Sequence, residues 1–244
     1  MIIQGAAHAE NFADMLVEHI QANRLSQSLE MITPVIQDKN PFCLLDRVGR
    51  CISPCKSQHL FPFLYQIADT HAEGSWVLII TALHYHPHAA RSVRLEITKQ
   101  CIIQADVWYG ADIFGERVHG PFLLMDLTTA LDHLEIWISH PDAWVRRTLG
   151  VAVHFWAKRT RGSQEGQEEV GQLLAFLSPL FEVQDMRAAK GIGWGLKTLG
   201  RYYPHATTDL LRDQLHTLHR QPKAVMRRKA LTYLPHELKA DLSP

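Results

Sequence analysis

Hydrophobic residues recur along nearly the whole chain at the spacing of an α-helix. Segments longer than about ten residues place apolar side chains three and four positions apart, and we find no convincing run with the alternation of a half-buried strand. Many of these segments are separated by short breaks at Pro41, Pro87, Pro141, Pro204 and Pro222. The pattern predicts an all-α protein with helices near 9–23, 26–37, 42–51, 57–69, 73–85, 88–104, 119–137, 142–158, 166–180, 185–202, 205–219 and 223–233.

Three of the predicted helices begin in a similar way. PDAWVRRTLGVAV from Pro141, VQDMRAAKGIGWGL from Val183 and QPKAVMRRKALTYL from Gln221 each combine a polar or proline start, one or two basic residues, and small and apolar residues. Their spacing of roughly 40 residues is typical of HEAT or armadillo repeats, in which pairs of helices stack into a curved array. We therefore expect residues 1–244 to form a single HEAT-like repeat domain, a right-handed α-solenoid (an α-α superhelix) of about six helical hairpins.

The overall composition is that of a folded, soluble protein. Of the 244 residues, 46% are hydrophobic and 20% are charged. The N-terminus lacks the basic stretch and apolar run of a secretion signal, and the longest apolar run, WVLIITALHY from Trp76, is too short to cross a bilayer. Four cysteines in such a chain indicate free thiols in a reducing compartment. We expect a cytoplasmic monomer that makes no contact with a membrane.

Charge is distributed unevenly along the chain. Residues 1–140 contain 9 Lys and Arg against 15 Asp and Glu, a net charge of −6. Residues 141–244 contain 16 against 10, a net charge of +6. The asymmetry indicates that the C-terminal part faces an anion, for example nucleic acid.

The segment KGIGWGLKTLGRYYP, from Lys190, combines helical periodicity with three closely spaced glycines. Each glycine inside a helix costs about 1 kcal/mol relative to alanine, so Gly191, Gly193 and Gly195 oppose the helix that their neighbours favour. Such a sequence indicates close approach of another group. That group is either a neighbouring helix or a ligand beside Trp194.

Two further segments carry candidate chemistry. In DVWYGADIF, Trp108 and Asp112 are four residues apart and share one face if the segment is helical. In DAWVRRTLG, Asp142 is placed as a helix N-cap, with Arg146 and Arg147 close behind it. Cations oppose the macrodipole at a helix N-terminus, so this pair predicts a compensating anion, for which a phosphate is suited. A solvated or salt-bridged pair is the other interpretation.

The order of these motifs resembles the AlkD-type DNA alkylation repair glycosylases, a family of HEAT-like repeat proteins. The resemblance rests on W-x-x-x-D, on W-V-R-R-T at a helix start, and on G-I-G-W-G-L-K-x-L-G-x-x-x-P, and it extends over residues 105–235. It implies a DNA glycosylase acting in base excision repair on double-stranded alkylated DNA. The expected reaction is hydrolysis of the N-glycosidic bond of N3- or N7-alkylated purines, such as 3-methyladenine and 7-methylguanine, without a metal or another cofactor.

The resemblance also assigns site residues. In that family a cleft holds two tryptophans, a carboxylate and an arginine, which match Trp108, Trp194, Asp112 and Arg147 of this chain. Asp112 would stabilise the positive charge that develops on the sugar and orient the water, while the two indoles would pack on the deoxyribose. Arg147 would hold a backbone phosphate. We expect further DNA contacts from Arg146, Lys190, Lys197 and Arg228.

A noncatalytic function is the alternative to a glycosylase. A HEAT-repeat scaffold that binds protein or structured nucleic acid through the same concave surface would share the fold. The acidic N-terminal part of the chain favours such a change of partner, whereas Asp112 together with both tryptophans favours chemistry.

Other residues that could form sites have simpler interpretations. His84, His86 and His88 alternate around Pro87, and we expect an interhelical turn with exposed imidazoles there rather than a metal site. A second set of possible ligands is interrupted by Pro54 and comprises Cys51, Cys55 and His59. We therefore predict no metal centre. The remaining tryptophans lie on apolar helix faces and are expected in the core: Trp76, Trp137, Trp144 and Trp156.

Overall fold

The computed structural model describes residues 1–88, 90–240 and 242 of the chain. These residues form helices, turns and loops and contain no β-strand, which confirms the all-α prediction. The chain divides into two compact units, Met1–Ile113 and Phe114–Pro244. The single continuous repeat domain stays a prediction.

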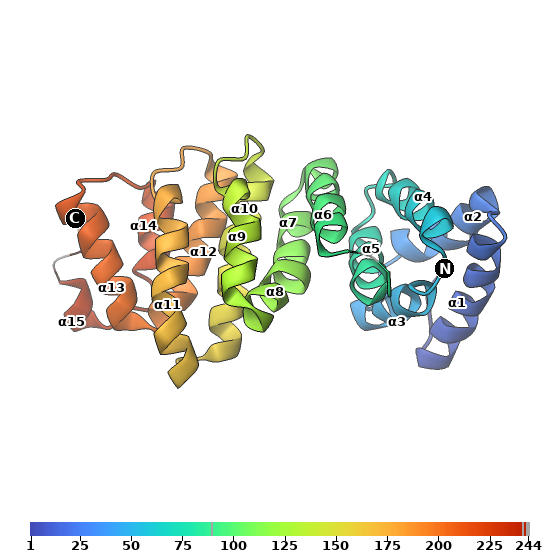
Figure 1. Cartoon of the computed structure of the whole chain (residues 1–244), viewed down its shortest axis with the longest axis horizontal. Coiled ribbons are helices and arrows are strands. Elements are labelled where there is room, and N and C mark those ends of the chain that lie inside the picture. The colour runs from blue at the N-terminus through green and yellow to red at the C-terminus, as the bar shows by residue number, and fades with distance from the viewer. Residues whose placement is uncertain (89, 241, 243–244) are drawn as a thin grey trace. The chain divides into compact units, whose positions relative to one another are not determined.

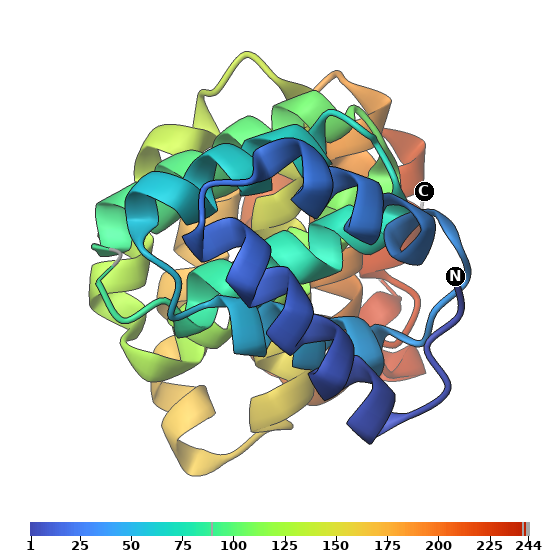
Figure 2. The ribbon, with the colours of Figure 1, turned by 90° about the vertical axis from the view of Figure 1, so that its right-hand side faces the viewer.

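The N-terminal unit consists of helices that pack in two layers. Helices α1, α3 and α5 contact one another in sequence, and α2, α4 and α6 do the same in the second layer. The first two helices are joined by the short turn at residues 22–24 (Figure 2). The helices of this unit are α1 (Ala6–Gln21), α2 (Leu25–Gln37), α3 (Phe42–Ile52), α4 (Ser57–Ala68), α5 (Glu73–Tyr85), α6 (Arg91–Ala105) and α7 (Trp108–Phe114), whose last residue belongs to the second unit.

Helix α5 lies in the core of the N-terminal unit. Every residue from Gly74 to Leu83 is buried, because the helix is apolar on all sides and contacts α2, α3, α4 and α6. Trp76 in this helix is fully buried, as predicted. None of the helices in the described part of the chain is long and apolar enough to cross a membrane.

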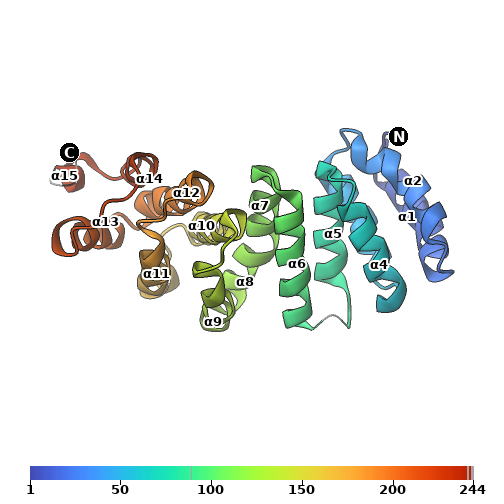
Figure 3. The same cartoon turned by 90° about the horizontal axis from the view of Figure 1, so that it is seen from above.

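The C-terminal unit also has two layers of helices. Figure 3 shows α10, α12 and α14 side by side in one layer and α9, α11 and α13 in the other. The elements of this unit, labelled in Figure 1, are a π-helical turn η1 (Gly115–His119), α8 (Gly120–Met125), α9 (Leu127–Ile138), α10 (Ala143–Thr160), α11 (Gln164–Leu177), a 3-10 turn η2 (Ser178–Leu180), α12 (Met186–Tyr202), α13 (Pro204–Arg212), a second π-helical turn η3 (Asp213–Thr217), α14 (Ala224–Ala230) and α15 (His236–Lys239).

Helices α10 and α12 approach each other closely at glycines. A Cβ atom added at Gly150 would lie 2.3 Å from the carbonyl oxygen of Gly191, and one added at Gly195 would lie 2.6 Å from the carbonyl oxygen of Gly150. Gly193 is in close contact with α14, where an added Cβ would lie 3.1 Å from the Cα of Met226. The glycines of this segment therefore serve helix packing, and Trp194 between them is half-buried.

Several helix boundaries differ from the sequence-based expectation. The predicted helix 119–137 is wrong, because the chain leaves helical geometry at Asp126 (φ −162°, ψ 88°) and α9 begins at the next residue. The Asp126 carboxylate accepts a hydrogen bond from the Thr129 amide at 3.1 Å, so this residue is the N-cap of α9. The predicted helix 88–104 includes residue 89, which lies outside the described residues, and the observed helix begins at Arg91.

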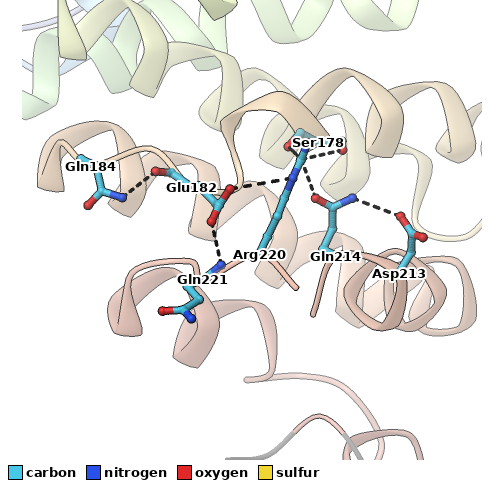
Figure 4. A network of polar contacts seen from close by, with 7 residues as sticks. All are labelled: Ser178, Glu182, Gln184, Asp213, Gln214, Arg220 and Gln221. Atoms are coloured by element: carbon cyan, nitrogen blue, oxygen red, sulfur yellow. Dashed lines mark hydrogen bonds and ion pairs between the residues drawn. The ribbon is translucent and has the colours of Figure 1, made fainter. Parts of the chain in front are cut away.

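A network of polar contacts holds the loop before α14 against the end of α11 (Figure 4). The guanidinium of Arg220 donates to the carbonyl oxygen of Ser178 at 2.9 Å and to the side-chain oxygen of Gln214 at 2.8 Å. The carboxylate of Glu182 accepts the amide of Gln221 at 2.9 Å. These contacts fix the entry to α14 and thereby position this helix beside α12.

Candidate active site

Trp108 and Asp112 lie one turn apart on α7, which confirms that they share a helix face. Trp108 is 59% exposed and its indole meets the ring of Tyr109 edge to face, with centroids 5.8 Å apart. Asp112 is half-buried. Because burial of an indole is strongly favourable, an exposed tryptophan beside a carboxylate is well placed to contact a ligand.

The first turn of α10 is built as the sequence predicts. Asp142 caps the helix, with its Oδ1 accepting the amides of Trp144 at 2.8 Å and Val145 at 3.0 Å. Arg146 donates to the carbonyl oxygens of His140 and Pro141, so part of its hydrogen-bonding capacity is used by the preceding loop. The capping carboxylate and these carbonyl groups therefore offset some of the charge of the basic pair.

Arg147 is largely buried and links α10 to α12. It is 8% exposed, and its Nη1 donates to the carbonyl oxygen of Arg187 at 3.3 Å. Two guanidinium groups lie near the indole of Trp144, that of Arg187 at 5.0 Å and that of Arg147 at 5.8 Å from the ring centroid. Asp185 caps α12, accepting the amide of Arg187 at 2.7 Å. The N-terminal turns of two neighbouring helices thus bring their basic residues together.

Trp194 stacks on a histidine of α10. Its ring centroid lies 4.2 Å from that of His154, and the two ring planes are 29° apart. The Nδ1 atom of His154 lies 2.6 Å from the hydroxyl oxygen of Thr198, one turn after Trp194 on α12. The Nε2 atom of His154 lies 3.7 Å from a carboxylate oxygen of Glu116. The candidate site tryptophan is therefore held from the side of α10.

Burial, together with the nearby charges of Lys158, Lys197 and Lys229, lowers the pKa of His154 to about 4. The imidazole is consequently neutral at neutral pH. Its stack with Trp194 is thus a contact between two uncharged rings.

The remaining predicted DNA contacts lie on α12 and α14. Lys190 and Arg228 are exposed, and Lys197 is half-buried with its ammonium 4.8 Å from the ring centroid of Tyr233. Arg201 also approaches Tyr233, at 5.2 Å. This part of the surface combines cations with an exposed aromatic ring.

Charge in the C-terminal unit separates by layer. Helices α10, α12 and α14 contain 11 Lys and Arg and no Asp or Glu, whereas α9, α11 and α13 contain 6 Asp and Glu and a single basic residue, Arg212. A layer in which every charged residue is basic attracts a polyanion over the length of several helices.

The structure brings Arg147 and Trp194 into one interface, because Arg147 packs on Gly191, one helical turn before Trp194. Trp108 and Asp112 belong to the other unit. The meeting of all four side chains in one groove stays a prediction.

A sequence model of a protein family covers most of these elements. The model, described as DNA alkylation repair enzyme, matches residues 66–234, well over half of the chain. The chain belongs to the DNA alkylation repair enzyme family. The match confirms the family inferred from the motifs and begins further upstream, within α4. A search of the curated proteins found none that matches this member of the DNA alkylation repair enzymes.

The histidines near Pro87 and the cysteines of this DNA alkylation repair family member agree only in part with the sequence-based expectation. Within the described ranges, no group of three or more His, Cys, Asp or Glu side chains could hold a metal ion. The prediction that the imidazoles near Pro87 are exposed is wrong for His86, which is 1% exposed and bonds the hydroxyl of Ser57 at 2.9 Å through Nε2. The four cysteines are free thiols, as predicted.

Sequence reasoning missed His154, Glu116 and Arg187 as neighbours of the candidate site. Arg187 carried a signal, since it lies just after the Asp185 cap, in the basic start that the three repeat-like segments share. His154 lies on an otherwise apolar helix, and its pairing with Trp194 depends on the close approach of α10 and α12 at glycine.

Proposed function

We propose that this protein is a DNA glycosylase that removes cationic N3- and N7-alkylated purines, such as 3-methyladenine and 7-methylguanine, from duplex DNA. The observation that carries the proposal is the layer formed by α10, α12 and α14, which contains only basic charged residues and also holds Arg147 and Trp194. Family membership makes alkylated DNA the polyanion that this layer would bind.

Asp112 is the proposed electrostatic catalyst. An alkylated purine of this kind is cationic and leaves with the electrons of the N-glycosidic bond, so no strong general acid is needed. As the bond lengthens, positive charge moves to the sugar, and a carboxylate beside it stabilises that state. At about 4 Å and an effective dielectric constant near 20, this attraction is about 4 kcal/mol, roughly a thousandfold in rate. Water then attacks C1′ and loses a proton, leaving an abasic site and a neutral base.

Trp108 and Trp194 are the proposed contacts to the deoxyribose of the lesion. Flat indole faces pack on the sugar and favour a nearby cation. Arg147, with Arg187 next to it at the start of α12, would hold a backbone phosphate, which fixes the position of the duplex without reading its sequence. Arg146, Lys190, Lys197 and Arg228 would add phosphate contacts from the same layer.

The proposed architecture is a right-handed α-solenoid of about six HEAT-like hairpins extending over residues 1–244. Its support is the alternation of helices between two layers within each unit and the repeated N-capped, basic starts of α10 and α12. In this proposal the enzyme acts as a cytoplasmic monomer, without a metal or organic cofactor.

Release of free base from alkylated DNA tests the proposed activity. The purified protein, incubated at low salt with duplex DNA carrying 7-methylguanine or 3-methyladenine, is expected to liberate the free methylated base and leave abasic sites. Chromatography of the ethanol-soluble fraction measures both bases. Tight binding of the duplex without any base release would instead support the noncatalytic scaffold.

A further inference from the structure

We propose that His154 is a positioning residue that fixes the indole of Trp194 in the orientation used by the site. The inference rests on the proposed function and extends it to a residue outside the matched motifs. The first observation is geometric: the two rings overlap with centroids 4.2 Å apart and planes 29° apart. Trp194 is half-buried, and the stack covers one face of its ring.

The hydrogen bonds of Thr198 determine the orientation of the imidazole. The Thr198 hydroxyl donates its one proton to the carbonyl oxygen of Trp194 at 3.2 Å, as a threonine in a helix commonly does four residues back. In the proposed arrangement its oxygen accepts from His154, whose Nδ1 lies 2.6 Å away. This arrangement assigns the imidazole proton to Nδ1. Two successive hydrogen bonds thus connect the imidazole of His154 on α10 to the backbone of Trp194.

Burial and three neighbouring cations keep the imidazole of His154 neutral. Lys158 faces it from its own helix, Lys197 from α12, Lys229 from α14 and Glu116 from η1, with the carboxylate at 3.7 Å from Nε2. Burial and, to a smaller extent, the three cations lower the pKa of the imidazole to about 4. A neutral ring suits a site in which positive charge develops on the sugar, because an imidazolium would oppose that charge.

The imidazole of His154 can stack on Trp194 only because helices α10 and α12 lie close together. Gly150 and Gly195 remove the side chains that would otherwise separate the two helices beside the stacked rings. The same glycines that pack the helices therefore set the distance between His154 and Trp194. This connection explains why a helix that carries a half-buried tryptophan also contains closely spaced glycines.

Three substitutions at one position separate stacking from hydrogen bonding. His154→Phe keeps a flat ring, His154→Asn keeps a donor for Thr198 but no ring, and His154→Ala removes both. With a methylated duplex, we expect the Ala and Asn variants to release base about tenfold more slowly in single turnover, with duplex affinity within about twofold. The Phe variant should keep the rate within about threefold. A matched control is His205→Ala, at an exposed histidine of α13, which should match the unsubstituted protein.

Two results would overturn the positioning role. One is an Ala variant with the unsubstituted rate, and the other is an Asn variant that retains the rate while the Phe variant loses it, since a hydrogen-bonding role alone predicts that order. Thermal unfolding of each variant shows that the compared proteins are folded.

Tryptophan fluorescence tests the stack without relying on activity. The difference between the emission spectra of a protein and its Trp194→Phe variant isolates the emission of Trp194. In the His154→Ala background this difference spectrum should shift to longer wavelength, because the indole gains contact with water, whereas identical difference spectra would refute the inference. If the protein releases no base, only the glycosylase proposal is contradicted, because the fluorescence comparison still tests the stack of His154 on Trp194.

Discussion

His119 is a buried histidine at the end of the π-helical turn η1. It is fully buried against Trp137, with ring centroids 4.7 Å apart, and neither ring nitrogen has a hydrogen-bond partner within the described part of the chain. Burial lowers the pKa of this imidazole to about 3. Between pH 6.5 and 3 the unfolded chain therefore binds a proton that the folded chain does not, so this residue makes the fold less stable as pH falls.

The substitution His119→Phe should reduce that pH dependence. Phenylalanine keeps a ring against Trp137 but binds no proton in either state. We expect the slope of the free energy of unfolding against pH, between pH 6.5 and 4, to fall by up to about 1.4 kcal/mol per pH unit. Urea unfolding at several pH values measures the slope. An unchanged slope would show that the imidazole titrates normally in the folded protein.

Removing the Arg147 guanidinium should weaken DNA binding without regard to sequence. In the proposed complex Arg147 contacts a phosphate, so Arg147→Ala should lower affinity for all duplexes and reduce the slope of log K against log salt by about 0.9. Because Arg147 also bonds the carbonyl oxygen of Arg187, the thermal stability of the variant has to be measured alongside. The slope is obtained from duplex affinities measured at several salt concentrations between about 50 and 200 mM. A slope equal to that of the unsubstituted protein would place Arg147 away from the phosphates.

At the scale of helices, the contact between α10 and α12 depends on the absence of side chains. Gly150→Ala would place a Cβ 2.3 Å from the carbonyl oxygen of Gly191, so the backbone of one helix must move. We expect a loss of about 3 kcal/mol in the free energy of unfolding, measured by chemical denaturation.

A glycine elsewhere provides the matched control for this substitution. Gly171 on α11 is exposed, and an added Cβ there meets nothing within 4 Å. Gly171→Ala should stabilise the protein by about 0.5–1 kcal/mol through helix propensity and chain entropy. Similar effects of both substitutions would contradict the packing account of the glycines.

Periodicity predicted most of the helices because nearly all of them bury one apolar face. The error at 119–137 arose because apolar residues continue in register across Asp126, while the decisive contact is the cap that its carboxylate makes to Thr129. The helix α7 is short, from Trp108 to Phe114, so the sequence predicted a shared face for Trp108 and Asp112 only on the condition that this segment is helical.

The candidate site was only partly predictable from the sequence. The spacing of Trp108 and Asp112 and the cap at Asp142 are local and could be read directly. The stack of His154 on Trp194 joins residues 40 positions apart through a helix contact, which no local pattern contains. The basic layer could not be recognised from the sequence either, because its helices α10, α12 and α14 are separated along the chain and lie side by side only in the folded structure.

At the scale of the whole chain, the two units carry opposite charge. Residues 1–113 contain 8 Lys and Arg against 11 Asp and Glu, and residues 114–244 contain 17 against 14. The basic layer lies in the C-terminal unit, so in the proposed function that unit supplies the main electrostatic attraction for DNA, and Asp112 on α7 supplies the catalytic carboxylate.

The most direct test of this division is the comparison of Asp112→Asn with the unsubstituted protein on the same methylated duplex. Asparagine preserves the size of the side chain but removes the negative charge. We predict that the single-turnover rate of base release falls by roughly a thousandfold while the dissociation constant for the duplex changes by less than about threefold. An Asp112→Asn protein that releases base at the original rate would contradict the account.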